Sequence, residues 1–456
     1  MPGCTDQPCK KKDRCASSIR RPVEPERSSN VERCWRCKCI NQAVRLMLTT
    51  RKLIAYFGPD SDDPVVRRRI TQWRLAGFAV LPFAFSRPQV TAPQPTQCIT
   101  LGRLSPQSRL VRIFSMFLAS IRLIVLRRRL ADVQLFVARN IDNLLLALIA
   151  RRVSRRRAPV VYEVLDINSS CTADDWHGRG LRMLEKWALA RVDLLVVSSP
   201  HFISNYYHER LSYRGRWFLF ENKVPKFAGL QRDAALEIGG RQTRTAPPWR
   251  IGWFGYLDDE RSWTVLKEVA RRLPDKVEIY VRGLPYTNFN MSGFLADVEH
   301  LDNVTYGGGF ANPDNLANIY GAVHLIWSID CNDLTANSRW LLTNSVYEAG
   351  YLQKPVIALG KTAVGEFVTS LGLGWCLDDP IEEHLARLIT ELTPDEYNRK
   401  IAHISSLTAQ RFCETNEIDE MRLLVEQEAG SSALTDDDTP RAGDVTRPAA
   451  AQFSRD

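Results

Sequence analysis

Residues 250–256 read RIGWFGY, a short apolar run that contains Gly255 near its end and leads into a helical pattern. Residues 345–350 read SVYEAG, a helical segment with one carboxylate, and residues 355–359 read PVIAL, a run typical of a buried strand. Strands that alternate with helices, with a glycine turn after the first strand, are typical of an α/β domain that binds a nucleotide. These stretches predict the fold class more directly than any other part of the chain.

The length and the cysteine distribution limit how the chain can be divided into domains and tails. A chain of 456 residues with 45% hydrophobic residues can form two domains of ordinary size plus tails. Six of the eleven cysteines lie in the first 39 residues, where Cys34 and Cys37 have the spacing of metal ligands. No second pair and no histidine accompany them in that segment. We therefore expect residues 1–50 to form a disordered leader, with a zinc site there as the alternative.

Positive charge is concentrated in one segment. Residues 103–157 contain thirteen arginines and only two acids, Asp132 and Asp142, whereas the net charge of the whole chain is +9. The rest of the chain is therefore close to neutral. One basic surface is predicted, with an anionic partner such as a membrane, a nucleic acid or a phosphorylated ligand.

The most hydrophobic stretch, residues 113–126, is shorter than the roughly 18 apolar residues of a spanning helix and is interrupted by Arg122. The start of the chain does not resemble a secretory signal. We expect a cytoplasmic protein with reduced thiols that lies peripherally on the inner membrane face. An amphipathic helix over residues 108–130 is a candidate contact with anionic lipid, and a purely core-facing helix is the alternative.

The pattern predicts one βα series before a linker and another after it. In the first series we expect a loop over residues 88–107, strands over 53–58, 78–83, 133–137, 160–166 and 194–198, and helices over 64–75, 108–130, 143–157 and 181–190. In the second we expect strands near 251–255, 277–281, 303–306, 323–328 and 355–359. The predicted domains are 51–224 and 250–428, joined by a linker over 225–249 and followed by a disordered tail over 429–456.

Several motifs occur in an order that is similar to a known family. They read AYFGPDS (55–61), RRRI (67–70), YEVLDI (162–167), VVSSP (196–200), IGWFGYLDDE (251–260) and NSVYEAG (344–350). Over residues 52–425 the chain resembles GT-B glycosyltransferases, particularly bacterial exopolysaccharide enzymes related to those of succinoglycan biosynthesis. The resemblance implies two Rossmann-like domains that face a cleft. It also implies a hexosyltransferase that moves a sugar from a nucleotide-sugar donor to a lipid-linked saccharide, with the nucleotide sugar as a substrate and no metal or other cofactor.

We expect a donor site in the second domain, formed by Gly255, Tyr256, Arg282, Arg339, Asn344, Tyr347 and Glu348. In retaining members of this fold a glutamate at the position of Glu348 binds the donor ribose. A second acid often lies eight positions earlier, where this chain has Trp340, so the anomeric outcome stays open. A solvated helix glutamate is the alternative interpretation of Glu348.

Phosphate binding is expected at two features of that domain. Gly255 allows close approach of the backbone to a phosphate, and the helix that starts near Asp259 offers free N–H groups; an ordinary strand-to-helix turn is the alternative. Arg282 and Arg339 are candidates to neutralise a diphosphate leaving group, and two exposed surface arginines are the alternative.

Acceptor chemistry is expected in the first domain. Asp166 ends the strongest predicted strand, where a carboxylate could take the proton of an attacking sugar hydroxyl. An aspartate that caps the next turn is the alternative. Asp60 holds the equivalent place after the first strand and is the second candidate base, and His177 is the third.

Two other classes of function compete with this prediction. A nucleic-acid- or anionic-surface-binding protein without catalytic activity would use the arginine-rich segment, but no known nucleic-acid-binding motif accompanies it, and we expect no nucleic acid as a partner. A dinucleotide oxidoreductase would carry a Gly-x-Gly-x-x-Gly motif after a strand, and the predicted strands lack it.

Overall fold

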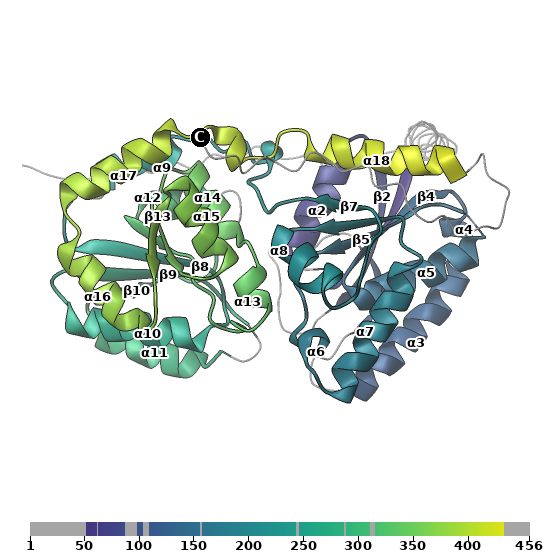
Figure 1. Ribbon diagram of the computed structural model, residues 1–456, viewed down its shortest axis with the longest axis horizontal. Coiled ribbons are helices and arrows are strands. Elements are labelled where there is room, and N and C mark those ends of the chain that lie inside the picture. The colour runs from purple at the N-terminus through teal and green to yellow at the C-terminus, as the bar shows by residue number, and fades with distance from the viewer. Residues whose placement is uncertain are drawn as a thin grey trace, which may run out of the picture. The chain divides into compact units, whose positions relative to one another are not determined.

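The computed structural model describes residues 52–432 except 62, 87–97, 104–108, 156, 243–245, 287–288 and 311–314. The predicted leader with Cys34 and Cys37 lies outside the described residues, as does nearly all of the predicted tail over 429–456. The two predicted βα series form two separate parallel sheets, each covered by its own helices (Figure 1).

The first sheet has seven strands in the order β3-β2-β1-β4-β5-β6-β7, and all neighbouring strands are parallel. Its strands are β1 (Leu53–Gly58), β2 (Ala79–Ser86), β3 (Ile99–Arg103), β4 (Val133–Arg139), β5 (Val160–Val164), β6 (Leu194–Val197) and β7 (Trp217–Leu219). The central strands β5 and β6 are buried throughout, because helices cover both faces of such a sheet.

Each face of the first sheet packs against a different group of helices. One face packs against α3 (Arg109–Val125), α5 (Ile141–Ser154) and α7 (Trp176–Leu189), and the short α4 (Arg127–Leu130) contacts α5. The other face packs against α2 (Pro64–Leu75) and α18 (Glu417–Ser432), which supplies Met421 and Val425 to that core. Helix α18, which runs along the first sheet in Figure 1, is thus part of the core of the first sheet although it follows the second sheet in sequence.

The second sheet has six strands in the order β10-β9-β8-β11-β12-β13. They are β8 (Trp249–Leu257), β9 (Val277–Pro285), β10 (Val304–Tyr306), β11 (Leu325–Trp327), β12 (Val356–Leu359) and β13 (Gly374–Leu377). One face packs against α10 (Glu260–Arg272), α11 (Met291–His300) and α16 (Ile381–Glu391). The other packs against α9 (Ala234–Gln242), α12 (Leu316–Gly321), α14 (Asn344–Tyr351) and α15 (Ala363–Leu371). Helices α13 (Asn337–Trp340) and α17 (Pro394–Ser406) complete this part of the chain, with short one-turn segments between the elements.

Some expectations about local structure are corrected. The prediction of a loop over 88–107 is wrong for residues 99–103, which form β3 and pair with β2. The predicted helix over 108–130 is divided into α3 and α4 at Leu126. Part of the segment expected to be a linker forms α9, whose Ala235 is fully buried in the second core. Within the described ranges, no helix has the length and apolar character needed to cross a membrane.

Candidate functional site

The carboxyl end of the first sheet places the expected Asp166 near two residues that the sequence did not single out, Arg139 and Asp63. Arg139 is the last residue of β4, and Asp166 follows β5, the neighbouring strand. The Nη1 atom of Arg139 donates a 2.9 Å hydrogen bond to Oδ2 of Asp63. Asp63 also caps α2 by accepting from the backbone N–H of Val65 at 2.8 Å. An ion pair thereby ties the end of β4 to the start of α2.

The two candidate bases differ in accessibility. Asp166 is exposed to solvent, whereas Asp60 has only 8% of its surface exposed. The protein around Asp166 raises the pKa of its carboxyl group by desolvation, Arg139 lowers this pKa, and Asp63 raises it. Asp166 is therefore the candidate that combines access to an acceptor with a raised basicity. His177, the third candidate, lies in the first turn of α7 and has its ring beside that of Trp176.

The arginine motif at 67–70 has a structural role in the first domain. Arg69 forms a buried ion pair with Glu163 of β5 and stacks on the ring of Phe220 at 3.8 Å. Glu163 also accepts a 3.1 Å hydrogen bond from the hydroxyl of Tyr56. Arg68 contacts the Lys223 carbonyl and pairs with a carboxylate that lies just before α18. These contacts fix α2 against the sheet, so Arg68 and Arg69 serve the fold and are not available to a ligand.

Gly255 lies inside β8, two residues before its end, and not in the strand-to-helix turn that the sequence predicted. Gly255 has φ +134°, a conformation that residues with a Cβ rarely adopt, and its missing side chain faces open space. On the adjacent strand, a Cβ on Gly283 would lie 1.9 Å from the carbonyl oxygen of Gly255. Gly283 is therefore required by the close approach of β8 and β9, whereas Gly255 is required by its own backbone conformation. Tyr256 is 42% exposed, and its ring lies 5.5 Å from that of Tyr286.

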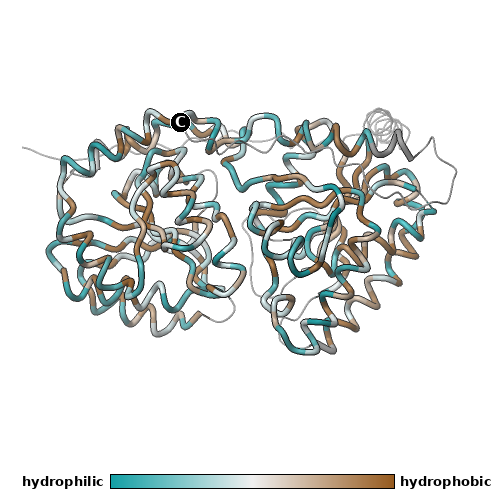
Figure 2. The backbone as a smooth tube through the Cα atoms, viewed as in Figure 1, coloured by the Kyte–Doolittle hydropathy of each residue, from teal (hydrophilic) through white to brown (hydrophobic). Residues whose placement is uncertain are grey.

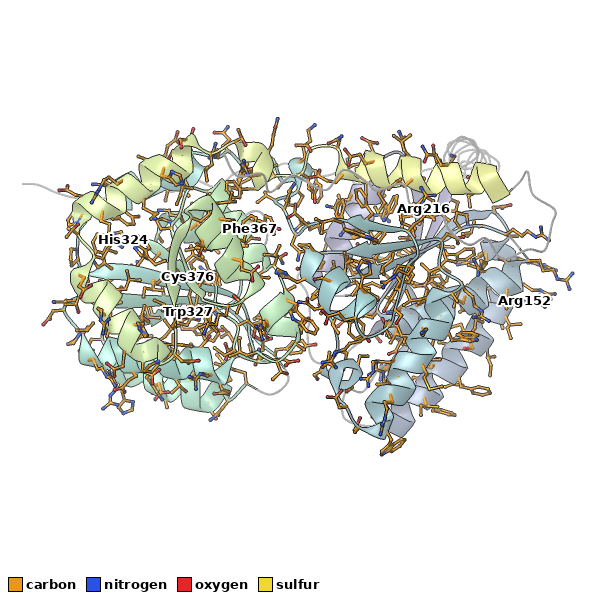
Figure 3. All side chains as sticks on the ribbon, in the orientation of Figure 1. Arg152, Arg216, His324, Trp327, Phe367 and Cys376 are labelled. Atoms are coloured by element: carbon orange, nitrogen blue, oxygen red, sulfur yellow. The ribbon has the colours of Figure 1, made fainter. Side chains whose placement is uncertain are left out.

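Helix α10 begins shortly after β8, and Asp259 caps its first turn. The Asp259 carboxylate accepts from the backbone N–H groups of Arg261 and Ser262 at 3.1 Å and from that of Cys331 at 2.8 Å. Trp327, labelled in Figure 3, donates from its indole nitrogen to the Ser262 hydroxyl at 3.0 Å. Asp259 thus joins the start of α10 to the loop after β11. It also occupies two of the N–H groups that the sequence analysis expected to be free for a phosphate. A surface hollow of about 600 Å³ lies beside this helix start and is lined by Arg261, Leu334, Asp379 and Pro380.

Asp258 is a site candidate that the sequence analysis did not single out. It is exposed at the end of β8, and its pKa is raised to about 6 by desolvation and then by the carboxylates of Asp330 and Asp259. The adjacent acids in 258–259 were visible in the sequence, but the third acid comes from the loop after β11. Only the sheet order, which makes β8 and β11 neighbours, brings that acid close.

Arg282 is engaged with the protein in this structure. Its Nε donates to the carbonyl of Gly308 at 3.0 Å, its Nη2 to the carbonyl of Gly309 at 2.7 Å, and its Nη1 to the Tyr280 hydroxyl at 3.0 Å. Two of its five N–H groups therefore hold the glycine-rich segment after β10, and a third binds Tyr280 of β9. Arg339, the other candidate for the leaving group, is exposed on α13.

Helix α14 carries three of the predicted donor residues. Glu348 is 7% exposed and accepts a 2.8 Å hydrogen bond on Oε2 from the hydroxyl of Tyr320 on α12. Tyr347 is buried and donates to Oε1 of Glu221 at 2.8 Å. Asn344, the first residue of the helix, is partly exposed. Glu348 is thus not the solvated surface residue of the alternative interpretation.

A group of hydroxyls at the start of α14 escaped the sequence analysis. The hydroxyl of Ser328, directly after β11, lies 2.8 Å from those of Thr343 and Ser345, which are 3.0 Å apart. Serine and threonine are too common for this group to stand out in a sequence. Together with Glu348 it gives the carboxyl end of the second sheet several polar groups suited to a sugar or a ribose.

Helix α13 connects the two sets of candidates. The side-chain oxygen of Asn337 accepts a 2.8 Å hydrogen bond from the backbone N–H of Ile167, the residue after Asp166. The Ser199 hydroxyl donates to the carbonyl oxygen of Trp340, and the Trp340 side chain packs in the core of the first sheet. The position eight residues before Glu348, where the resemblance led us to look for a second acid, is therefore occupied by a buried packing residue. Arg339 lies between these two contact residues.

Among the residues that the structure describes, no group of three or more histidine, cysteine, aspartate or glutamate side chains is arranged to hold a metal ion. No family model matches the chain. The succinoglycan biosynthesis protein ExoL of Rhizobium meliloti (strain 1021) is 32% identical over 363 residues, which are 77% of this chain and 87% of ExoL.

Solved structures of similar architecture cover most of the chain. Sucrose-phosphate synthase from Thermosynechococcus elongatus matches with a TM-score of 0.62 and 15% identity, over 84% of this chain and 100% of that one. HepE from Anabaena in complex with UDP and glucose matches with a TM-score of 0.59 and 17% identity, over 84% of this chain and 100% of HepE. At such identities the likeness concerns the fold, and it confirms the predicted arrangement of two Rossmann-like domains. The chain belongs to the glycosyltransferase family that includes the succinoglycan biosynthesis protein ExoL, and its fold is GT-B.

Proposed function

We propose that this glycosyltransferase moves a hexose from a UDP-sugar, bound at the carboxyl end of the second sheet, to a lipid-linked saccharide in exopolysaccharide biosynthesis. The acceptor would lie at the carboxyl end of the first sheet, on the cytoplasmic face of the inner membrane. The named product of the ExoL pathway, succinoglycan, supports an exopolysaccharide acceptor. The UDP and glucose bound to HepE support a UDP-sugar as the donor.

The observation that carries this proposal is the 2.8 Å hydrogen bond between Ile167 and Asn337. It joins the residue next to the exposed Asp166 to the segment that continues into α14 and Glu348. A carboxylate suited to an acceptor hydroxyl and a buried carboxylate suited to a donor ribose are thus linked through one short helix. Such a pairing is what transfer between two bound sugars requires.

In the proposed reaction, an acceptor hydroxyl oxygen forms a bond with the anomeric carbon of the donor. The bond from that carbon to the diphosphate breaks, and its electron pair leaves with UDP. Asp166 takes the proton of the attacking hydroxyl, a role favoured by its raised pKa. The exposed guanidinium of Arg339 stabilises the charge that develops on the diphosphate, and Gly255 lets the backbone approach that group.

The donor residues have different parts in this proposal. Glu348, held by Tyr320, binds the ribose hydroxyls, and Asn344 and the exposed Tyr256 contact the remaining donor groups. Tyr347 acts indirectly through its hydrogen bond to Glu221. Arg282 acts indirectly as well, because its contacts with Gly308 and Gly309 fix a loop at the same end of the sheet.

The test is release of UDP from a panel of UDP-sugars in the presence of lipid-linked saccharides extracted from Rhizobium meliloti. We expect one UDP-sugar to be consumed, with the labelled sugar recovered in the lipid fraction. GDP- and dTDP-sugars serve as controls for the nucleotide. Transfer from one of these in place of every UDP-sugar would contradict the proposed donor, and recovery of label only as free sugar would contradict the proposed acceptor.

A further inference from the structure

Helix α3 exposes most of its large apolar side chains and buries small ones, which is the reverse of an ordinary surface helix. Its small residues Ser115 and Ala119, together with Leu123, face the protein and are buried. Eight large apolar residues of the same helix are exposed, with between 43% and 76% of their surface accessible: Val111, Ile113, Phe114, Phe117, Leu118, Ile121, Ile124 and Val125. An ordinary surface helix buries its large apolar residues and exposes its polar ones. Hydrophobic colouring follows α3 along its length in Figure 2.

Helix α7 adds a second exposed apolar row on the same side of the sheet. Trp176 is 78% exposed, Met183 74% and Trp187 49%. Both α3 and α7 pack against α5, and all three helices contribute to one core. Exposed apolar residues in this number, on helices that share one core, indicate a binding surface, because monomeric soluble proteins rarely expose large apolar patches. Tryptophan is also the side chain most typical of the lipid–water interface.

The charged residues around these helices are predominantly positive. From Arg109 to Leu130 the sequence has no acidic residue, and Arg122 and the three arginines of α4 are exposed. Arg152, at the end of α5, points outward at the edge of the domain in Figure 3 and is exposed. On α7, Arg179 and Lys186 are exposed, and the guanidinium of Arg191 lies 3.9 Å from the ring centre of Trp187.

Most of the acids near these helices are already engaged. Asp142 of α5 pairs with Arg112 of α3. Asp174 lies 3.6 Å from Arg210, and Asp175 caps α7. Glu185 is buried beneath α7, where the hydroxyls of three tyrosines donate to it. The surface therefore combines exposed apolar groups with an excess of arginine.

We propose that the face formed by α3, α4 and α7, here called the α3/α7 face, docks on an anionic lipid bilayer. The apolar side chains enter the boundary between headgroups and acyl chains, and the arginines bind the lipid phosphates. The helices lie in the plane of the interface and do not span it, because the buried Ala119 and Leu123 hold α3 on the core of its sheet. This proposal does not depend on the proposed reaction, since lipid binding needs neither donor nor acceptor.

The test is flotation of the purified full chain with phosphatidylcholine vesicles, with and without phosphatidylglycerol. We expect binding only when the anionic lipid is present, and weaker binding as salt rises. Replacement of all three α4 arginines (Arg127→Gln, Arg128→Gln and Arg129→Gln) should lower vesicle affinity about a hundredfold, since each arginine contributes roughly fivefold. The double variant Phe114→Ser/Phe117→Ser should lower affinity at least about tenfold, because each exposed ring is lost from the apolar contact.

The matched control is Leu423→Ser. Leu423 is 51% exposed on α18, on the opposite face of the same sheet, and its loss should leave vesicle binding unchanged. Thermal unfolding of every variant checks that the fold is intact, which the exposure of the replaced residues favours. Wild-type protein that floats with neither vesicle, or variants of the α3/α7 face that bind as wild type does, would overturn the proposal. So would a concentration-dependent dimer that these variants abolish, since the face would then be covered by a second copy of the chain.

Discussion

The hydroxyl of Tyr320 donates a 2.8 Å hydrogen bond to Oε2 of Glu348, and both side chains are buried. Glu348 lies on α14 and Tyr320 on α12, so one bond fixes the direction of the carboxylate relative to a second helix. The pKa of Tyr320 is raised well above its usual range by burial and then by Glu348, so the phenol remains a donor at any physiological pH. A carboxylate fixed in this way needs little reorganisation when a ribose arrives.

The first prediction removes this hydrogen bond. Tyr320→Phe should weaken UDP binding about tenfold and lower the free energy of unfolding by about 2 kcal/mol, because a hydrogen bond to a charged group is lost. Calorimetry with UDP and thermal unfolding measure the two effects. Tyr397→Phe is the control, since that buried hydroxyl donates to the His324 carbonyl at the other end of the same sheet. Its UDP affinity should stay at the wild-type value; equal losses in both variants would mean that Tyr320 acts only on stability.

The second prediction concerns the proposed base. Asp166→Asn should lower kcat at least about a hundredfold and leave UDP affinity unchanged, because the amide cannot take a proton. The transfer assay and UDP calorimetry measure these quantities. Asp174→Asn is the control, as this exposed aspartate lies in the same segment and has 90% of its side chain accessible. A kcat for Asp166→Asn within a few-fold of wild type would assign the base elsewhere.

The third prediction follows from the electrostatic effect of Arg139 on Asp166. The base works in its ionised form, so activity rises as pH rises through the pKa of Asp166, which desolvation raises and Arg139 lowers. In Arg139→Gln this pKa should rise further, and the acidic limb of the kcat/KM profile should move up by about one pH unit. Arg210→Gln, which removes a surface partner of Asp174, is the control and should leave the limb in place. A limb that stays fixed or moves to lower pH in Arg139→Gln would contradict the proposed base.

The fourth prediction concerns the backbone conformation of Gly255 in β8. Gly255→Ala should lower the free energy of unfolding by about 1–3 kcal/mol and weaken UDP binding, because alanine is strained at φ +134° even though the space beside it is open. Gly180→Ala, at an open position inside α7 without this conformation, should be neutral or stabilising by up to about 1 kcal/mol. Chemical denaturation of both variants distinguishes backbone strain from the added methyl group. Equal stability of the two variants would mean that the positive φ of Gly255 does not require a glycine.

The fifth prediction concerns Asp258, whose pKa is raised to about 6 by desolvation and by Asp330 and Asp259. A carboxyl group with a higher pKa in the folded chain binds its proton more tightly there, so its contribution to stability falls as pH rises from about 4 to about 6. Asp258→Asn should therefore raise the Tm relative to wild type at pH 7 and make little difference at pH 4. Thermal unfolding at the two pH values tests this. A Tm that falls at pH 7 would mean that the ionised form of Asp258 is stabilising.

The sequence predicted the repeating units of both sheets because each unit is a local pattern. The helix over 64–75 and the strand over 53–58 were predicted with the bounds that the structure has. The strands β3, β7 and β13 were missed; each has only three to five residues and lies at an edge of its sheet. Their assignment depends on pairing with a neighbouring strand, which a local pattern does not contain.

The same limit applies to the site. Gly255 and Glu348 could be found from the sequence because a glycine near the end of an apolar run and a carboxylate in an apolar helix are both local features. Arg139 gave none, since it is one of thirteen arginines in its segment, and its partner Asp63 is 76 positions away. The contacts of Arg282 with Gly308 and Gly309 likewise depend on the pairing of β9 with β10. The position of α18 on the first core could not be predicted, because its pattern suits either domain.

The most direct test of the central claim is calorimetric titration of UDP into wild-type protein and into Glu348→Gln, with GDP and dTDP as comparison ligands. The amide oxygen of the substituted side chain can still accept the hydrogen bond from Tyr320, so the fold should be kept while the charge is lost. The account predicts that wild-type protein binds UDP in preference to the other nucleotides and that Glu348→Gln binds it about tenfold more weakly. Equal affinity of the two proteins for UDP, or no binding by wild-type protein, would contradict a UDP-sugar site at Glu348.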